Sequence, residues 1–270
     1  MSAAAPASPV PARRRPARRL GRRLAPVLGL LPLVVGLACW ELFGDKGSPT
    51  FPPPSTWWDA LRILNDDGTL MPAIGETLKT FAVALAVATA IGVALGIAIG
   101  MSRIVDRALG PLLEFFRIMP PPAIIPVAVL VIGTNLQMKV LVVVLACVWP
   151  ILLNTTSAVR AIPPVRIAMA RSLRLSNPAL LRKVIVPSTL PGSVLGLRVA
   201  TPLCFIVTLV VEMLASSGGV GQLILLNQRN FNAQAVFGLL VVIALLGLAL
   251  SLLIAATESR ALRRWPVRGS

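Results

Sequence analysis

The sequence contains no histidine and no tyrosine, and only 10 of its 270 residues are acidic. The side chain that most often serves as a metal ligand and as a general acid or base is therefore absent. Three cysteines, Cys39, Cys147 and Cys204, lie far apart in apolar stretches and form no C-x-x-C pair. These absences argue against a zinc site. We expect the cysteines to be small buried hydrophobic residues.

Charged residues of either sign are also scarce. They make up 13% of the chain, against about 25% in soluble domains, while 56% of the residues are hydrophobic and the mean hydropathy is +0.83. A soluble chain of this composition has too little polar surface to cover itself. The formal net charge of +16 would suit a nucleic-acid-binding protein, but the arginines flank apolar runs and form no basic face on a soluble domain. No nucleic-acid partner is expected.

Long apolar runs are what the sequence has in abundance. A bilayer core needs about 20 apolar residues per helix, and six stretches approach or reach that length, at residues 24–43, 78–101, 118–133, 138–159, 190–214 and 235–257. The third begins among four prolines, which a helix tolerates at its start. The first also resembles a signal peptide, but residues 38–41 (ACWE) make a poor cleavage site. The sequence predicts an all-α membrane protein of six transmembrane helices.

The distribution of Lys and Arg predicts the orientation of these spans. Of the 26 basic residues, 21 lie in the N-terminal segment, in the second-to-third and fourth-to-fifth connections, and in the C-terminal segment. Basic residues collect on the cytoplasmic side, so both termini are predicted to be cytoplasmic. Residues 1–23, rich in Arg and Pro, are predicted to be a disordered tail. Residues 24–257 would form a single six-span membrane domain, and residues 258–270 a second cytoplasmic tail.

The cytoplasmic segment 161–189 predicts two short helices. Pro163 and Pro164 would open the first; Ser176 or Asn177 would cap the second, with Pro178 at its first position. At 100° per residue, the first helix has an apolar stripe and an opposite basic side that also includes Ile167. The stripe is Val165, Met169 and Leu173, and the basic residues are Arg166, Arg171 and Arg174. An apolar side chain ringed by arginines, as Ile167 is on this wheel, suggests a docking surface for another protein. The alternative is an amphipathic helix lying on the membrane surface.

The same segment resembles a motif of binding-protein-dependent ABC importers, written EAA, three residues, G, nine residues, I-x-L-P. Here Ala168, Met169 and Ala170 occupy the EAA positions, Arg174 the glycine, and residues 184–187 (VIVP) the end. The spacing is kept, although Ala168 replaces Glu and Arg174 replaces Gly. Three further segments are similar to nitrate, sulfonate and taurine permeases: 51–57 (FPPPSTW), 117–126 (RIMPPPAIIP) and 211–222 (VEMLASSGGVGQ).

The resemblance implies a type I ABC importer permease in the cell (inner) membrane that takes a small, anionic, nitrate- or sulfonate-like solute inward by alternating access. It implies as partners two ATP-binding subunits, an extracytoplasmic solute-binding protein and a second permease copy, as a homodimer. The chain itself would be no enzyme and hold no cofactor, because ATP binds the partner, and the sequence has no GxxxxGK[ST] loop. The implied ATPase-coupling residues are Arg166, Ile167, Ala168, Met169, Ala170, Arg171, Arg174 and Leu175.

Polar residues inside the spans are the candidates for contact with the solute. They are Asn154, Thr155, Thr208 and Glu212. Each has an alternative role, since Thr and Asn often hydrogen-bond between helices, and Glu212 would equally cap the glycine-rich turn that follows it. Gly92, Gly96 and Gly100, four residues apart, predict close helix packing. A secondary transporter acting alone and a membrane-embedded enzyme are the competing function classes. The chain shows no detectable internal repeat and no paired intramembrane carboxylates to support them.

Overall fold

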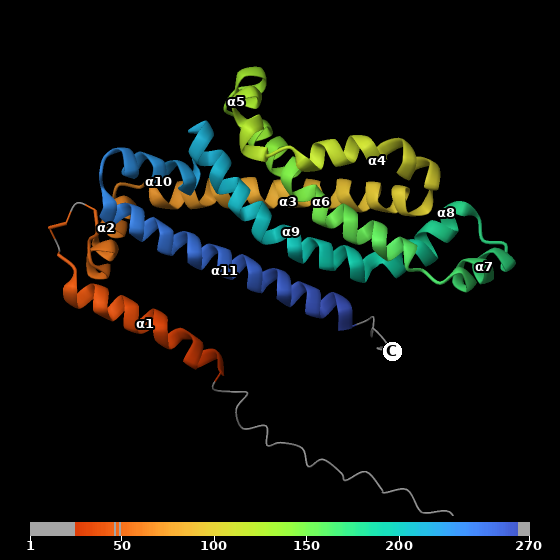
Figure 1. Cartoon of the computed structure of the whole chain (residues 1–270), viewed down its shortest axis with the longest axis horizontal. Coiled ribbons are helices and arrows are strands. Elements are labelled where there is room, and N and C mark those ends of the chain that lie inside the picture. Colours follow the sequence, from red (N-terminus) through yellow and green to blue (C-terminus); the bar gives the residue numbers. More distant parts are fainter. Residues whose placement is uncertain (1–24, 46, 49, 264–270) are drawn as a thin grey trace, which may run out of the picture.

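The computed structural model describes residues 25–263 except 46 and 49, so the predicted tail at 1–23 and residues 264–270 lie outside the described residues. The described chain is almost entirely helical (Figure 1). Its elements, in order, are α1 (Ala25–Phe43), α2 (Pro54–Asp66), α3 (Leu70–Met101), α4 (Arg103–Ile118), α5 (Pro121–Ile132), α6 (Leu136–Arg160), α7 (Pro164–Ser172), α8 (Asn177–Leu180), the π-helical turn η2 (Leu181–Ile185), α9 (Val186–Ala215), α10 (Gly219–Arg229) and α11 (Ala233–Arg263).

Four helical stretches are long and apolar enough to cross a membrane: Leu70–Met101, Leu136–Arg160, Asn177–Ala215 and Ala233–Glu258. The bent pair α4 and α5 would make a fifth. Of the first predicted span, the described residues give only a shorter apolar helix, Leu31–Phe43. The all-helical membrane fold is therefore confirmed with four or five spans, while the count of six and the position of both termini stay predictions.

The third predicted span is shorter than the sequence indicated. Its helix α5 begins at Pro121, after Pro120 in an extended conformation, as the proline run predicts. With 12 residues it is about 18 Å long, which is too short to cross a bilayer core of about 30 Å. Instead, the preceding connection is helical (α4), and the chain bends by 93° between α4 and α5. Prolines 120–122 explain the bend, since they prevent one helix from continuing into the other.

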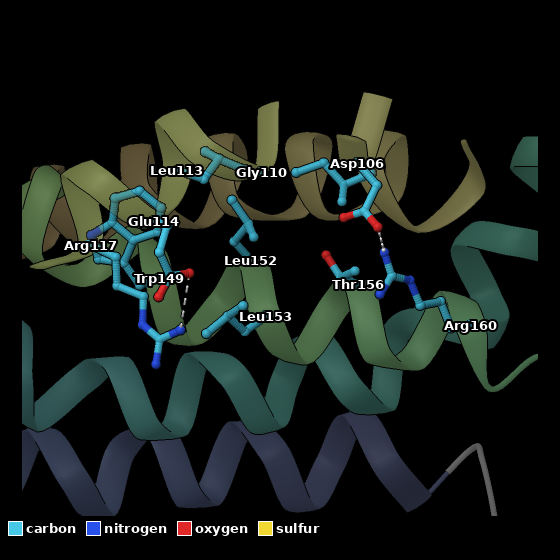
Figure 2. Close-up of a pocket in the computed structure, with 11 residues that line it drawn as sticks. Asp106, Gly110, Leu113, Glu114, Arg117, Trp149, Leu152, Leu153, Thr156 and Arg160 are labelled. Atoms are coloured by element: carbon cyan, nitrogen blue, oxygen red, sulfur yellow. Dashed lines mark ion pairs between the residues drawn. The ribbon is translucent and has the colours of Figure 1, made fainter. Parts of the chain in front are cut away.

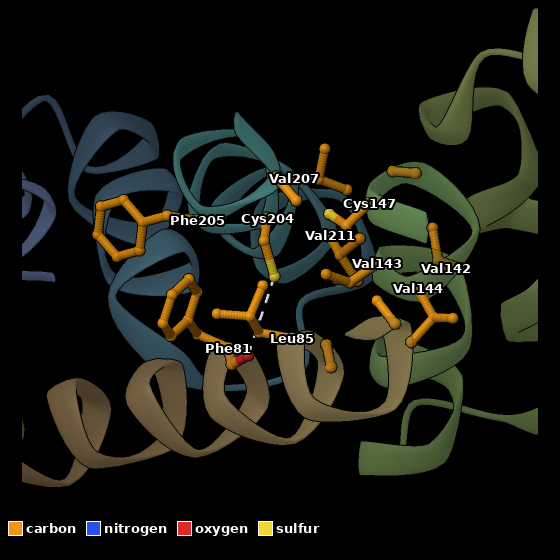
Figure 3. Close-up of a cluster of buried hydrophobic side chains, with 14 of the residues drawn as sticks. Phe81, Leu85, Val142, Val143, Val144, Cys147, Cys204, Phe205, Val207 and Val211 are labelled. Atoms are coloured by element: carbon orange, nitrogen blue, oxygen red, sulfur yellow. Dashed lines mark hydrogen bonds between the residues drawn. The ribbon is translucent and has the colours of Figure 1, made fainter. Parts of the chain in front are cut away.

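The core of the protein lies where α3, α6 and α9 pack against one another. Figure 3 shows Phe81 and Leu85 of α3, Val142 and Val143 of α6, and Phe205 of α9 in one buried cluster. Cys147 and Cys204 are buried in it and free, as predicted, and the Cys204 Sγ lies 3.8 Å from the Phe81 carbonyl oxygen. Cys39 contradicts the prediction, because it is exposed on α1, which packs against little besides α2.

The three glycines of α3 permit the contact between α3 and α6. A Cβ atom on Gly92 would lie 2.9 Å from the Cβ of Ile151, one on Gly96 2.7 Å from that of Thr155, and one on Gly100 2.6 Å from that of Val159. These partners recur every four residues along α6, so the two helices run with their backbones close together. The predicted packing role of the glycines is confirmed.

The two ends of the molecule carry opposite charges. Helices α2 and α10 lie at one end in Figure 1, and α7 and α8 at the other. Acidic residues gather at the α2 end: Asp45, Asp59, Asp66, Asp67 and Glu76. Basic residues gather at the α7 end: Arg160, Arg166, Arg171, Arg174, Arg182 and Lys183. This polarity along the long axis agrees with the predicted inner and outer sides.

Candidate functional site

Helix α7 is the predicted docking helix, and its start follows from two prolines. Pro163 precedes it in an extended conformation and Pro164 occupies its first position, where a proline has no helical hydrogen bond to lose. The second predicted helix does begin at Asn177 after Ser176. It does not end before the membrane, however, because α8 runs through η2 into α9. Helices α7 and α8 form a helical hairpin, and no loop separates this hairpin from the spanning helix α9. A movement of the hairpin would therefore be transmitted directly to α9.

One face of α7 holds the hairpin together. Ala170 is buried, and Ile167 and Leu175 pack against it in a cluster with Val159 and Leu180. The prediction that Ile167 belongs to the outward basic side is therefore wrong. The 100° wheel placed it among the arginines, but α8 and η2 pack against that edge of the helix and leave the side chain half-buried.

The opposite face of α7 is apolar and uncovered. Val165, Met169 and Leu173 are 68%, 63% and 76% exposed, and we call these three residues the docking patch. Arg166 and Ala168 of α7 are also exposed, and so is Arg171, which lies on the side of the helix away from the patch. The Arg166 guanidinium donates a hydrogen bond of 3.1 Å to Ser188 Oγ on α9. An exposed apolar patch on a helix that also carries exposed arginines is typical of a protein interface.

Arg174 ends α7 in the left-handed conformation, with φ of 53°. The Leu175 N–H donates to the Ala170 carbonyl at 3.2 Å and the Arg174 N–H to the Arg171 carbonyl at 2.8 Å, which is the hydrogen-bond pattern of a Schellman cap. Glycine is the usual residue at such a position because it has no Cβ to clash. The motif's glycine is thus explained by the helix end, and this chain keeps the geometry with an arginine.

We expect Arg174→Gly to stabilise the protein by about 1 kcal/mol, because the left-handed conformation disfavours a residue with a Cβ by about that amount. Thermal unfolding in detergent measures the change. Ser172→Gly, two residues earlier in right-handed helix, is the matched control and should destabilise by about 0.5 kcal/mol. A destabilised Arg174→Gly variant would show that the guanidinium makes a stabilising contact that outweighs the backbone strain.

The predicted solute-path residues do not lie at one site. Asn154 and Thr155 lie on α6, where the Asn154 amide donates to the Pro150 carbonyl at 2.8 Å and Thr155 Oγ1 lies 2.9 Å from Ser193 Oγ of α9. Thr208, fully buried on α9, donates to the Cys204 carbonyl at 2.8 Å. Glu212 is one helical turn further along α9 and is also fully buried. All four side chains have partners inside this chain.

Glu212 belongs to a buried network that the sequence only partly revealed. Its Oε2 accepts from Thr77 Oγ1 at 2.8 Å and from the Gly221 N–H at 3.1 Å, while Thr77 Oγ1 accepts from the Val220 N–H at 2.9 Å. Two free N–H groups at the start of α10 are thereby satisfied by α3 and α9. Gly219, with φ of 86°, has no room for a Cβ beside the Glu212 carboxyl group. The capping role considered for Glu212 is confirmed.

Lys139 of α6 is a member of this region that the sequence analysis missed. Its side chain is only 5% exposed, and its ammonium group donates to the Ser217 carbonyl at 2.8 Å. In the sequence Lys139 is the only charged residue of its apolar run, which was the available signal. Glu212, Thr77 and Lys139 together fix the turn between α9 and α10 on the α2 end of the molecule.

Comparison with known proteins agrees with this arrangement. Residues 88–263 match the family described as "Binding-protein-dependent transport system inner membrane component". The bicarbonate transport system permease protein CmpB of Synechocystis sp. is 31% identical over 214 residues, which is 74% of each chain. The putative aliphatic sulfonates transport permease protein SsuC of Bacillus subtilis is 27% identical over 238 residues, covering 87% of this chain and 85% of that protein.

A solved structure of the MetNI methionine ABC transporter in inward-facing conformations has the same fold. The superposition has a TM-score of 0.59 at 19% identity and covers 70% of this chain and 94% of the other. The likeness to this solved structure identifies a type I ABC importer permease fold. With the matched segment spanning α3 to α11, the chain belongs to the family of inner membrane components of binding-protein-dependent transport systems.

Proposed function

We propose that this permease imports a small oxyanion by alternating access, driven by ATPase subunits that dock on α7. The docking patch of Val165, Met169 and Leu173 is the observation that carries the proposal, because it is exposed and apolar. It lies on a helix that packs against α8 and η2, and these continue into the spanning helix α9. Closure of the ATPase dimer would move the α7–α8 hairpin, and the unbroken helix from Asn177 to Ala215 would carry that motion through the membrane.

The partners of the proposal are two ATP-binding subunits, an extracytoplasmic solute-binding protein and a second copy of this chain. The ATPase-coupling residues would be Arg166 to Arg171, with Arg174 and Leu175. The oxyanion class is inferred from relatives named for bicarbonate and for aliphatic sulfonates. A path through Asn154, Thr155, Thr208 and Glu212 stays a prediction, since each of them is hydrogen-bonded within the chain.

The test is the double variant Met169→Asp and Leu173→Asp, reconstituted in proteoliposomes with the cognate ATPase subunits. Two carboxylates in an apolar interface would be desolvated without partners, so we expect coupled uptake of the radiolabelled oxyanion to fall at least about tenfold, in line with the loss of interface hot spots. The permease should remain folded, because both side chains are exposed.

Two controls accompany this variant. Arg182→Asp adds a carboxylate to exposed η2 outside the docking patch, and it should retain coupling. Ile167→Asp should instead lower the thermal stability, since Ile167 packs inside the hairpin. Undiminished uptake in the double variant would contradict docking at α7. Uptake by the permease alone, without ATPase subunits, would favour the competing class of lone transporter.

A further inference from the structure

Helix α4 has its polar and apolar faces reversed relative to a helix of a soluble protein. Its apolar side chains Ile104, Leu112, Phe115 and Ile118 are 82%, 52%, 60% and 73% exposed. Its charged side chains instead lie on the face that lines a pocket against α6. In a membrane protein this reversal is expected of a helix that turns an apolar face to lipid and a polar face to a water-filled space.

The space between α4 and α6 is a two-part pocket at the α7 end. One part, of about 160 Å³, is shown in Figure 2, and its lining includes Glu114 and Arg117 of α4 together with Trp149 and Thr156 of α6. The second part, of about 630 Å³, is lined by Arg103, Asp106, Arg107 and Arg160 together with the end of α3. The two parts share Ile99, Asp106 and Arg160.

An ion pair lies where the two parts meet. Arg160 of α6 and Asp106 of α4 approach to 2.7 Å, and their side chains are 51% and 44% exposed. The larger part has three arginines and one carboxylate among its lining residues, so its lining carries a net charge of about +2. Arginine presents a planar fork that suits carboxylates and other oxyanions. The Asp106 carboxylate is itself an oxyanion, and it already pairs with Arg160, one of the arginines that line this basic pocket.

We propose that the α4–α6 pocket binds a small oxyanion, with Arg160 as its principal cation, and that the oxyanion displaces the Asp106 carboxylate. This inference rests on the proposed function and adds an exit site for the imported solute at the α7 end. Arg160 is the last residue of α6, and only residues 161–163 separate it from α7. Motion of the docking helix would thus act directly on the ion pair that the leaving solute exchanges with.

The experiment is calorimetric titration of the full-length chain in phosphatidylcholine nanodiscs with nitrate, bicarbonate and methanesulfonate, at ionic strength held constant with chloride. We expect saturable binding of at least one of the three. Arg160→Gln should abolish it, whereas Asp106→Asn should tighten it about fivefold, the factor for removing one exposed competing carboxylate. The opposite signs matter, since a purely structural ion pair would give the same effect from either side.

The matched controls are Arg198→Gln and Glu258→Gln, which break a different inter-helix ion pair, of 3.3 Å between α9 and α11, and should leave binding unchanged. Weaker binding in Asp106→Asn, or no saturable binding of any probe, overturns the proposal. A lipid headgroup would offer the same oxyanion chemistry. Phosphatidylglycerol that co-purifies only when Arg160 is present, without binding of the free probes, would assign the pocket to lipid and also overturn it.

The proposed function is tested separately by uptake in the wild-type complex. Absence of ATP-driven uptake together with the opposite-sign pattern would keep the binding site and reject its role in import. ATP-driven uptake without that pattern would reject the site and keep the importer.

Discussion

Gly96→Leu is expected to prevent the chain from forming a stable folded monomer in detergent. A Cβ at this position would lie 2.7 Å from the Thr155 Cβ and 2.9 Å from the Leu152 carbonyl oxygen. Backbone and Cβ atoms cannot move aside as a flexible side-chain end does, so α3 and α6 must separate. Overpacking typically destabilises by about 1–3 kcal/mol, and a leucine in the middle of the most extensive helix contact should exceed that range. Size-exclusion chromatography and thermal unfolding measure the outcome.

Gly75→Leu is the matched control on the same helix. No atom outside the helix lies within 4 Å of a Cβ built on Gly75, and leucine is a better helix former than glycine by about 0.8 kcal/mol. This variant should fold as well as the wild type or slightly better. A well-folded Gly96→Leu protein would show that the α3–α6 contact adapts, which would contradict the close backbone packing.

Glu212→Ala is expected to destabilise the protein by about 2–4 kcal/mol, while Glu212→Gln should stay within about 1 kcal/mol of the wild type. The alanine leaves the Thr77 hydroxyl and the Gly221 N–H without their acceptor, and each unsatisfied buried donor costs about 1–3 kcal/mol. The glutamine retains an oxygen at the same place. Thermal unfolding in a defined detergent, followed by circular dichroism, measures both variants.

The glutamine variant also separates the two roles considered for Glu212. If the side chain acts by capping α10, Glu212→Gln should retain ATP-driven uptake. A folded Glu212→Gln permease that no longer takes up its solute would instead favour direct contact with the solute. Thr77→Val and Thr208→Val are the paired controls: both remove a buried hydroxyl, but only Thr77 accepts from α10. The first should therefore cost more stability than the second.

Local sequence signals were sufficient wherever the backbone itself determines the structure. Proline positions fixed the starts of α5, α7 and α8, because the ring sets φ and removes a donor. The four-residue spacing of Gly92, Gly96 and Gly100 predicted a close helix contact, since that spacing places all three on one face. Composition alone identified a membrane protein, because a chain with 13% charged residues cannot cover a soluble surface.

Signals failed where the neighbour of a side chain decides its role. Ile167 was expected to face outward with the arginines, but it is half-buried against α8 and η2. Lys139 and Thr77 carried no site prediction, although they are only a few ångströms from the α9–α10 turn in space and far from it in sequence. The connection 103–117 looked like a basic loop, and it is a helix whose charges line a pocket with α6. Each of these contacts joins residues that are distant in the sequence, so no local repeat of apolar or charged residues could predict it.

The sequence by itself therefore determined that this is a membrane protein, that it is helical, and which family it resembles. Hydropathy, proline positions and motif spacing are all properties of contiguous residues. Only the tertiary structure decided which face of α7 is free to dock, why the motif's glycine position suits a left-handed residue, and that Asp106 meets Arg160. Those features depend on groups that packing brings together. The free energy of packing depends on distances between atoms of residues far apart in the chain, and the sequence does not contain those distances.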